Sequence, residues 1–411
     1  MHTLRPDCRG CHSTDLEIVI DLGEQPLAGG FLTLEQIPLE KKYPLQIYFC
    51  RKCALVQVLD VVDADTLFKE YFYLSSVTKT LSQHFEDEAE TLRKTVLAGD
   101  SPLAVEFGCN DGVLLLPLKT LGVRTVGVEP SKNVSEIARQ KGLDVICDYF
   151  TPRVAKDIAA KHGQADAVLA NNVFAHIDNL DAVLEGVTAL LKPDGSFVFE
   201  VHYLASLLEG LQYDFFYHEH LCYYSVHSLS VLLGRFGLRI YKAERLAIHA
   251  GSIRVYACRD ASAIATGPSV AELLTLEDSM GMQSASTYKQ FAKRVADHRG
   301  KLVTLLGSYK KQGKKIAGYG ASGRANTLLN YCGIGTKTLE FIADDSPLRQ
   351  NQFTPGSHVP IKLAAELAAN PPDCILVLAW SYLDEICRKQ QAFADAGGIF
   401  LVPFPEPKVI L

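Results

Sequence analysis

Short apolar runs alternate with helical segments through the middle of this chain. Strands are predicted at residues 102–108, 125–129, 144–146, 166–170 and 196–200, with helices beginning at residue 113 and covering residues 134–141. Alternation of strands with helices indicates a doubly wound parallel sheet, because each parallel connection needs a crossover that a helix supplies. The middle of the chain is therefore predicted to be an α/β domain.

The pattern differs on either side of this domain. Before it, residues 43–50 alternate as a strand does, residues 21–26 indicate a turn, and residues 79–97 have helical spacing. After it, residues 261–312 lack strand patterning and are predicted to be helical. A second α/β block follows, with strands at 315–320, 339–343, 374–379 and 398–402. The predicted domains are residues 1–75, 76–260 and 261–411.

Two cysteine pairs lie in the first of these domains. Cys8 and Cys11 form one CxxC hook, and Cys50 and Cys53 form the other. Four thiolates suit the tetrahedral geometry of zinc and leave no open coordination position, so a structural zinc ion is predicted. Disulfides or plain reduced thiols are the alternatives. The cysteine count of eleven is odd and no apolar signal segment opens the sequence, which favours a reducing cytoplasm over a disulfide framework.

Bulk composition narrows the class of protein. Hydrophobic residues make up 48% of the 411 residues, charged residues make up 21%, and the net charge is −6. An acidic chain does not present the basic face that tracks nucleic-acid phosphates. No apolar run approaches the roughly 20 residues that span a bilayer. A cytoplasmic protein with a small-molecule partner, and with neither nucleic acid nor membrane as a partner, is expected.

A candidate cofactor site follows the first strand of the central domain. Its loop carries Glu106, Gly108, Asn110 and Gly112, at the carboxyl end of a strand, where ligands of open α/β sheets bind. Glu129 ends the next strand and is placed to accept the hydroxyls of a ribose. The acidic loop disfavours a pyrophosphate and favours a sulfonium, so S-adenosylmethionine is predicted rather than NAD. The side chains expected beside its methionine part are those of Asn171 and Asn172.

The densest group of proton-transfer side chains runs from Tyr217 to His220. It lacks the HExxH spacing of metalloproteases. In an extended segment His218 and His220 would share one face, whereas on a helix Glu219 would not hold His220. A single histidine is most often structural and partly buried, but four adjacent groups that can act as acids or bases favour a catalytic role.

These motifs belong to a set that covers the whole chain. The set comprises the two CxxC pairs, DLGEQPL from Asp21, YFYLS from Tyr71, EFGCNDG from Glu106, NNVFAH from Asn171, YHEH from Tyr217 and GYGASGR from Gly318. Each motif alone is weak, but together they are specific. The chain resembles the nucleotide-sugar C-methyltransferases of deoxysugar biosynthesis, which make branched sugars such as tetronitrose, mycarose and noviose.

The resemblance implies a reaction that these residues can support. The substrate would be a nucleotide-linked 4-keto-6-deoxy sugar, most often linked to thymidine diphosphate. A base removes a proton from C-3, or from C-5 in some members, and the enolate takes the methyl group. By the family's YHEH motif His220 would be the base, with Glu219 as the other candidate. Tyr217 and Tyr71 would donate hydrogen bonds to the enolate oxygen, and His176 would bind substrate.

The second α/β block carries a glycine-rich loop, Gly318–Arg324, which follows a strand and opens a helix. It satisfies the dinucleotide fingerprint, but no acid stands at the usual distance; the nearest is the pair Asp344 and Asp345. A helix N-terminus also binds any diphosphate. The loop is therefore predicted to hold the diphosphate of the sugar nucleotide through the side chains of Ser322, Arg324 and Arg349.

Other functions remain open at this point. An NAD-dependent dehydrogenase or epimerase would use the C-terminal fingerprint, and an O- or N-methyltransferase would share the cofactor. A zinc module that only docks a partner is disfavoured by the large α/β portion. One motif departs from the family: His249-Ala250-Gly251 stands where His-Gly-Gly is usual, which adds a methyl group to a tight segment.

Overall fold

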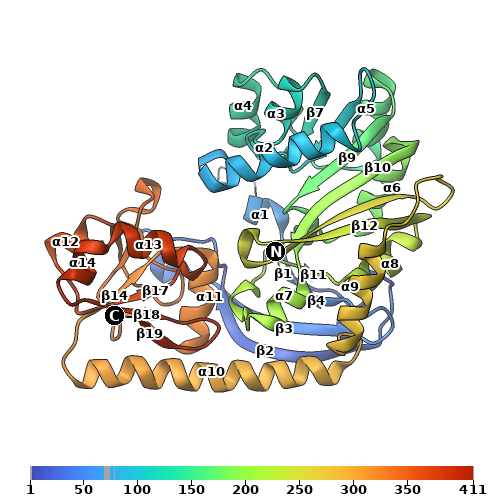
Figure 1. Cartoon of the computed structure of the whole chain (residues 1–411). Coiled ribbons are helices and arrows are strands. Elements are labelled where there is room, and N and C mark those ends of the chain that lie inside the picture. Colours follow the sequence, from blue (N-terminus) through green and yellow to red (C-terminus); the bar gives the residue numbers. More distant parts are fainter. Residues whose placement is uncertain (1, 69–74, 78, 411) are drawn as a thin grey trace.

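The structure is a computed structural model that describes residues 2–68, 75–77 and 79–410. The central sheet and its helices lie at the top right of Figure 1, and the C-terminal α/β unit lies at the left. The N-terminal strands lie below the central sheet and to the right of the C-terminal unit, and the long helix α10 runs along the base. The predicted domain boundaries at residues 75 and 260 stay predictions.

The N-terminal region is built from antiparallel strands. Its elements are β1 (His2–Leu4), β2 (Leu16–Pro26), η1 (Ile37–Leu39), β3 (Lys42–Cys50), β4 (Val56–Val58), β5 (Asp60–Val62) and α1 (Ala64–Phe68). The strand predicted at residues 43–50 is confirmed as β3. The turn predicted at residues 21–26 is wrong, because β2 continues to Pro26. The polar residues there mark a register shift between Asp21 and Glu24 against β3, not a chain reversal.

The expected doubly wound parallel sheet is confirmed in the central domain. Its strands are β6 (Leu103–Phe107), β7 (Arg124–Val128), β8 (Val145–Ile146), β9 (Ala165–Asn171), β10 (Leu191–His202), β12 (Leu238–Leu246) and β13 (Ser252–Arg259). The strand order is β12-β13-β10-β9-β6-β7-β8, parallel from β8 to β10, while β13 runs antiparallel to β10. The carboxyl ends of β6, β7, β9 and β10 therefore share one edge of the sheet.

Helices cover both faces of this sheet. They are α2 (Lys79–Lys94), α3 (Leu115–Thr120), α4 (Lys132–Gln140), α5 (Pro152–His162), α6 (Leu180–Leu190), α7 (Leu204–Glu209) and α8 (Val226–Gly234). In α6 the buried side chains of Leu180, Val183, Leu184, Val187 and Leu190 follow the helical period. Burial of each contributes about 1.5–3 kcal/mol, which holds the helix on the sheet.

The C-terminal unit repeats the same principle. Its strands are β14 (Ile316–Tyr319), β15 (Ile342–Asp344), β16 (Ile361–Leu363), β17 (Cys374–Val377), β18 (Ile399–Val402) and β19 (Lys408–Ile410), in the order β16-β15-β14-β17-β18-β19. Its helices are α11 (Gly323–Cys332), α12 (Glu366–Ala369), α13 (Leu383–Lys389) and α14 (Gln391–Asp395). The four predicted strands are confirmed, and only β19 is antiparallel to its neighbour.

Helices α9 (Pro268–Ser279) and α10 (Ala285–Lys311) fill the predicted helical stretch. One side of α10 packs on all three regions in turn. The Tyr288 ring lies 5.1 Å from that of Phe49 in β3, and Phe291 meets Phe216 of the central domain edge-on. Further along, His298 stacks on Phe404 of the C-terminal unit. The helix therefore holds the three regions in a fixed relation (Figure 1).

A strand from the central part of the chain completes the N-terminal sheet. β11 (Cys222–Tyr223) pairs with β4, and the sheet order is β11-β4-β3-β2. The segment just before β11 is the YHEH motif, so this pairing carries the motif to the N-terminal region. Among the described residues no helix is long and apolar enough to cross a membrane. All eleven cysteines are free of disulfides.

The N-terminal region also touches the C-terminal unit directly. The side-chain amide of buried Asn326, in α11, donates to the backbone oxygen of Ala28 at 2.6 Å. We expect Asn326→Ala to lower the free energy of unfolding by about 1–3 kcal/mol, because it leaves a buried carbonyl unpaired. Urea denaturation checks this loss. The exposed Thr336 provides the control variant, Thr336→Ala, and equal midpoints for the two variants would contradict the prediction.

Candidate active site

The loop after β6 packs closely against the rest of the domain at two glycines. Gly108 and Gly112 both have positive φ, at +65° and +79°. A Cβ on Gly108 would lie 2.6 Å from the side chain of Val173, so no other residue fits without displacement. The backbone amide of Asn110 donates to Glu129 at 3.0 Å, which ties this loop to the end of β7.

Acidic side chains gather beneath this loop. Glu106, Asp111 and Glu129 are all buried. Glu129 accepts backbone N–H bonds from Asn110 and Ser131, whereas one oxygen of Glu106 and one of Asp111 have no hydrogen-bond partner. Burial, with the nearby charges of Glu129 and Asp111, raises the pKa of Glu106 to about 8. The loop therefore favours a positively charged ligand.

Asn171 and Asn172 follow β9, as predicted, but the side chain of Asn171 is already engaged. Its amide nitrogen lies 3.2 Å from both oxygens of Glu88, and its oxygen accepts from the backbone N–H of Glu200. The backbone N–H of Asn172 donates to the carbonyl of Glu200 at 2.9 Å. The side chain of Asn171 therefore stabilises the end of β9 through contacts inside the protein.

These contacts belong to a buried ionic network that consists of His84, Glu88, Asn171, Glu200 and Arg254. The Arg254 guanidinium pairs with both carboxylates, and His84 bonds Glu200 at 2.8 Å. Ligand atoms of His84, Glu88 and Glu200 lie within 4.8 Å of one another, as in a metal site. Arg254 already supplies the positive charge there, so a metal cation is disfavoured.

Arg254 ends the motif in which Ala250 replaces the usual glycine. Both His249 and Ala250 have positive φ, at 54° and 64°. An alanine in this conformation costs roughly 1–2 kcal/mol that glycine avoids. Alanine in place of glycine at position 250 therefore introduces local backbone strain that the fold tolerates. The position of Arg254 is not disturbed by it.

The YHEH segment is a turn, neither a strand nor a helix. The backbone N–H of His220 donates to the carbonyl of Tyr217 at 2.9 Å. The turn sends its side chains to different regions. His218 is buried against β3 and lies 3.0 Å from the backbone oxygen of Pro44, so it does not share a face with His220.

The hydrogen bonds of His220 determine its tautomer. Its Nδ1 lies 3.1 Å from the carbonyl oxygen of Phe215 and must donate there, so Nε2 is unprotonated and accepts from the Tyr217 hydroxyl at 2.9 Å. The His176 ring meets His220 edge-on at 4.8 Å. Burial holds the pKa of His220 well below its usual range, and the cost of protonating it beside the rings of His176 and His202 lowers that pKa further. His220 is therefore a neutral imidazole at neutral pH.

Glu219 lies where the three regions meet. Its Oε1 accepts the backbone N–H of Gly29 at 3.0 Å, next to the Ala28 carbonyl that Asn326 holds. Its second oxygen is shielded from solvent and has no hydrogen-bond partner. Burial raises the pKa of Glu219. Tyr71, the remaining predicted catalytic residue, lies outside the described residues.

The predicted diphosphate residues all have partners inside the protein. Ser322 caps α11 by accepting from the backbone N–H of Ala325. Arg349 donates to the backbone oxygen of Ala321 and lies 3.4 Å from Asp344. The carboxylate of Asp344 also accepts the N–H of Ala321 at 2.7 Å, so an acid fills the glycine-rich loop.

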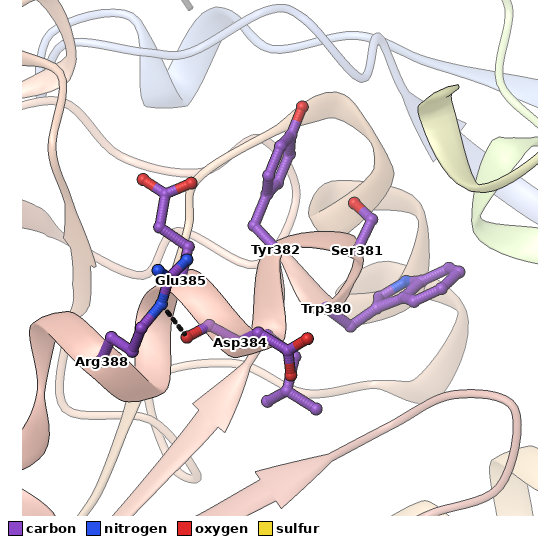
Figure 2. A pocket seen from close by; sticks show the side chains of 7 residues that line it. Trp380, Ser381, Tyr382, Asp384, Glu385 and Arg388 are labelled. Atoms are coloured by element: carbon purple, nitrogen blue, oxygen red, sulfur yellow. Dashed lines mark hydrogen bonds between the residues drawn. The ribbon is translucent and has the colours of Figure 1, made fainter. Parts of the chain in front are cut away.

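Arg324 points toward the central domain. Its Nε donates to buried Asp214 at 3.0 Å, and its guanidinium lies 3.8 Å from the ring centre of Phe215 and 4.5 Å from that of Trp380. The Trp380 indole N–H donates to the same carboxylate. Figure 2 shows Trp380 at one side of a surface pocket and Arg388 at the other.

Sequence reasoning missed several of these residues. Asp214, Phe215, Trp380 and His202 match no motif, because each acts through packing between segments distant in the chain. A polar residue at the carboxyl end of β10 was a usable signal for His202, since the candidate cofactor residues were predicted by the same rule.

The four cysteines come together as predicted. The sulfurs of Cys8 and Cys53 lie 3.5 Å apart and those of Cys11 and Cys50 lie 3.6 Å apart, and all four lie within 4.8 Å of one another. Zn–S bonds of about 2.3 Å in a tetrahedron place sulfurs about 3.8 Å apart. The residues therefore fit a zinc ion with four thiolates.

Comparisons with known proteins agree with this arrangement. Three family models match in turn: a proposed zinc-binding domain at residues 8–68, a methyltransferase domain at 83–243 and a C-methyltransferase C-terminal domain at 247–405. The C-methyltransferase NovU of Streptomyces niveus is 38% identical over 405 residues, 98% of this chain and 96% of that protein. These matches favour methyl transfer over the NAD-dependent alternative.

Other matches cover only part of the chain. A ubiquinone biosynthesis O-methyltransferase from Methylobacterium is 30% identical over 105 residues, 24% of this chain and 42% of that protein. The crystal structure of magnesium protoporphyrin IX methyltransferase from Synechocystis with bound SAM is 16% identical and covers 44% of this chain and 81% of that one, with a TM-score of 0.33. A score that low carries no argument about fold.

The chain is thus a methyltransferase with a cysteine-bound zinc module at its start. It belongs to the C-methyltransferase family, since the relative at 38% identity is matched over nearly its full length. The match to a methyltransferase-domain model agrees with the class I methyltransferase fold and the S-adenosylmethionine cofactor predicted from the sequence.

Removal of one zinc ligand tests the metal site. We expect Cys50→Ser to lose the zinc ion and to lower the apparent Tm by more than about 5 °C, because the ion contributes folding energy to the N-terminal region. Elemental analysis and thermal unfolding measure the two effects. Cys387→Ser, at a half-buried C-terminal cysteine, is the control. Full zinc content and wild-type Tm in Cys50→Ser would contradict the assignment.

Proposed function

We propose that this protein methylates a carbon atom of a nucleotide-linked 4-keto-6-deoxy sugar, with thymidine diphosphate as the expected nucleotide. His220 removes the proton from C-3. The observation that carries the proposal is the tautomer of His220, whose Nδ1–H donates to Phe215 and whose Nε2 is the proton acceptor. A base held in this orientation beside a ketone can remove a proton from the neighbouring carbon, and that carbon then becomes nucleophilic.

The acidic loop suits the methyl donor. S-adenosylmethionine supplies an electrophilic methyl group when bound, and it carries a sulfonium and an ammonium charge but no phosphate. One buried oxygen of Glu106 and one of Asp111 lack hydrogen bonds in the protein, and Lys141 already pairs with the Asp111 carboxylate, so Glu106 is the group that a cationic ligand would satisfy. Glu129, at the end of β7, stands where a ribose is bound in such sheets.

The proton step uses the Tyr217–His220 pair. Substrate entry turns the Tyr217 hydroxyl from Nε2 toward the ketone oxygen. The C-3 proton passes to Nε2, and the electron pair of the C–H bond moves into the enolate. The imidazolium keeps its Nδ1–H bond to Phe215, and the Tyr217 O–H donates to the enolate oxygen.

Glu219 is the second candidate for the base. Its Oε2 is unpartnered and burial raises the pKa of this carboxyl, both of which suit a proton acceptor. Its Oε1, however, holds the Gly29 amide at the junction of the regions. We therefore propose that Glu219 orients the site and that His220 takes the proton.

The nucleotide is proposed to lie toward the C-terminal unit. Arg324 and Trp380 belong to that unit. The Arg324 guanidinium lies over the rings of Trp380 and of Phe215, and the Phe215 carbonyl accepts from His220. Arg324 is already compensated by Asp214, so its role is to position Phe215 as much as to contact a diphosphate. The backbone amides of Ala321 and Ala325 are taken by Asp344 and Ser322, so a diphosphate at the start of α11 would use the amides between them.

Substitution of the base separates the two half-reactions. We expect His220→Asn to lower methyl transfer by at least about 100-fold while S-adenosylmethionine binding is unchanged. Incorporation of labelled methyl into thymidine diphosphate-4-keto-6-deoxyglucose measures transfer, and deuterium exchange at C-3 without the donor measures deprotonation. Near-normal exchange in this variant would remove His220 from the role.

The remote His162→Asn variant is the control, because His162 lies at the end of α5. The wild-type pH profile adds a second check. Since burial depresses the pKa of His220, this base remains neutral at pH values below 6.5. At saturating S-adenosylmethionine, kcat/KM for the sugar nucleotide should therefore fall only at more acidic pH. Methylation of a hydroxyl or amine in the product would instead support an O- or N-methyltransferase.

The pKa of Glu106 makes cofactor binding depend on pH. Glu106 binds its proton up to about pH 8 in the free protein and must lose it to bind a cation. S-adenosylmethionine affinity should therefore rise between pH 6 and 8, with proton release. Isothermal titration in buffers of different ionisation enthalpy measures both effects.

The variant Glu106→Gln should abolish this pH dependence, whereas Glu86→Gln, at an exposed position of α2, should retain it. The same shift affects stability. An unfolded Glu106 loses its proton near pH 4.5, so its contribution to folding falls as pH rises from about 4.5 to 8. Equal pH profiles for wild type and Glu106→Gln would refute the assignment.

A further inference from the structure

His202 is the last residue of β10 and lies at the same edge of the sheet as the loop from Gly108 to Gly112, the proposed cofactor site. Neither of its ring nitrogens has a hydrogen bond, and both are shielded from solvent. Buried polar groups are almost always paired, and an unpaired one costs about 1–3 kcal/mol. Shielded, unpaired oxygens also occur nearby on Gln212, Asp214 and Glu219. This concentration indicates a place where the protein meets a polar ligand.

Packing holds the His202 ring in one orientation. It stacks on Phe215 with ring centres 3.7 Å apart and planes 14° apart. Arg324 lies at a similar contact distance from the same ring, and two groups that close must occupy opposite faces. Phe215 in turn accepts the Nδ1–H bond of His220 through its carbonyl. His202 is therefore a rigid neighbour of the proposed base.

The charge of His202 follows from the same surroundings. Burial and the positive charge of Arg324 hold the pKa of His202 well below its usual range, so the ring is neutral. A neutral imidazole has one N–H donor and one acceptor nitrogen. Gln212 is the polar neighbour: its amide nitrogen donates to Ala250 at 2.8 Å, which leaves its oxygen as an acceptor. Gln212 is also the polar side chain that interacts with the His202 ring, so we assign the ring N–H to its oxygen, which leaves the other ring nitrogen as an acceptor in need of a donor.

We propose that His202 binds the substrate by accepting a hydrogen bond from a hydroxyl of the hexose, and that it thereby orients the sugar ring over His220. The inference rests on the proposed function, since it needs a sugar substrate at His220. A ketone oxygen could not serve, because it has no proton to donate. His202 thus selects for a hydroxylated position of the sugar, separately from the ketone that Tyr217 recognises.

The test uses two variants of opposite chemistry. His202→Phe keeps the stack on Phe215 and removes both nitrogens, whereas His202→Gln restores an acceptor oxygen. Thymidine diphosphate-4-keto-6-deoxyglucose is the probe. We expect His202→Phe to weaken probe binding about 10- to 100-fold, as for loss of one buried hydrogen bond, and His202→Gln to recover part of it. S-adenosylmethionine affinity and Tm should stay near wild type in both.

Analogues of the probe identify the hydroxyl. Forms that lack the C-2 or the C-3 hydroxyl are compared between wild type and His202→Phe. For one analogue, the affinity of the wild type should drop to that of His202→Phe for the full probe. The affinity of His202→Phe for the same analogue should be no lower than its affinity for the full probe. Wild-type binding by His202→Phe, or equal losses with every analogue, would overturn the inference while methyl transfer by wild type upholds the proposed function. A wild-type protein that neither binds nor methylates the probe overturns both.

Discussion

The contact between Glu219 and the backbone of Gly29 is the constraint on which the site depends. It joins the central domain to a loop of the N-terminal region, and the neighbouring Ala28 carbonyl is held by Asn326 of the C-terminal unit. Removing one partner from a buried charged pair costs roughly 3–5 kcal/mol, so the ion pair of Arg324 with Asp214 adds a second firm link. The turn from Tyr217 to His220 is therefore positioned by contacts with all three regions and not by one region alone.

This arrangement explains why the side chains of the four consecutive residues from Tyr217 to His220 make contacts in different regions. A turn lets His218 anchor in β3, Glu219 reach the Gly29 loop, and His220 face Tyr217 and His176. A strand would have sent alternate side chains to only two faces. The zinc module contributes indirectly: its four sulfurs secure the strands on which β11 and His218 rest.

Local pattern was sufficient for much of this fold. The parallel strands of both α/β units were predictable because each is a short apolar run bounded by turn residues, and the zinc ligands because their spacing is distinctive. The turn at residues 21–26 was mistaken, since Gly23 and its polar neighbours mark a register shift equally well. The positions of Asp214, Phe215 and Trp380 depend on contacts across more than a hundred residues, which no local pattern encodes. The resemblance to C-methyltransferases pointed to His220 and Glu219 as candidates, which stay predictions, but it did not indicate the carbonyl that orients the histidine or the carboxylate that holds Arg324.

The pairing of β11 with β4 limits how the chain can be recombined. A chimera that exchanges the first 75 residues for those of a relative would separate β11 from its native sheet partner and Glu219 from its amide. Exchange of the site between relatives therefore requires the loop at residues 27–31 and the segment 213–223 to be moved together as one unit, although nearly two hundred positions separate them in the sequence.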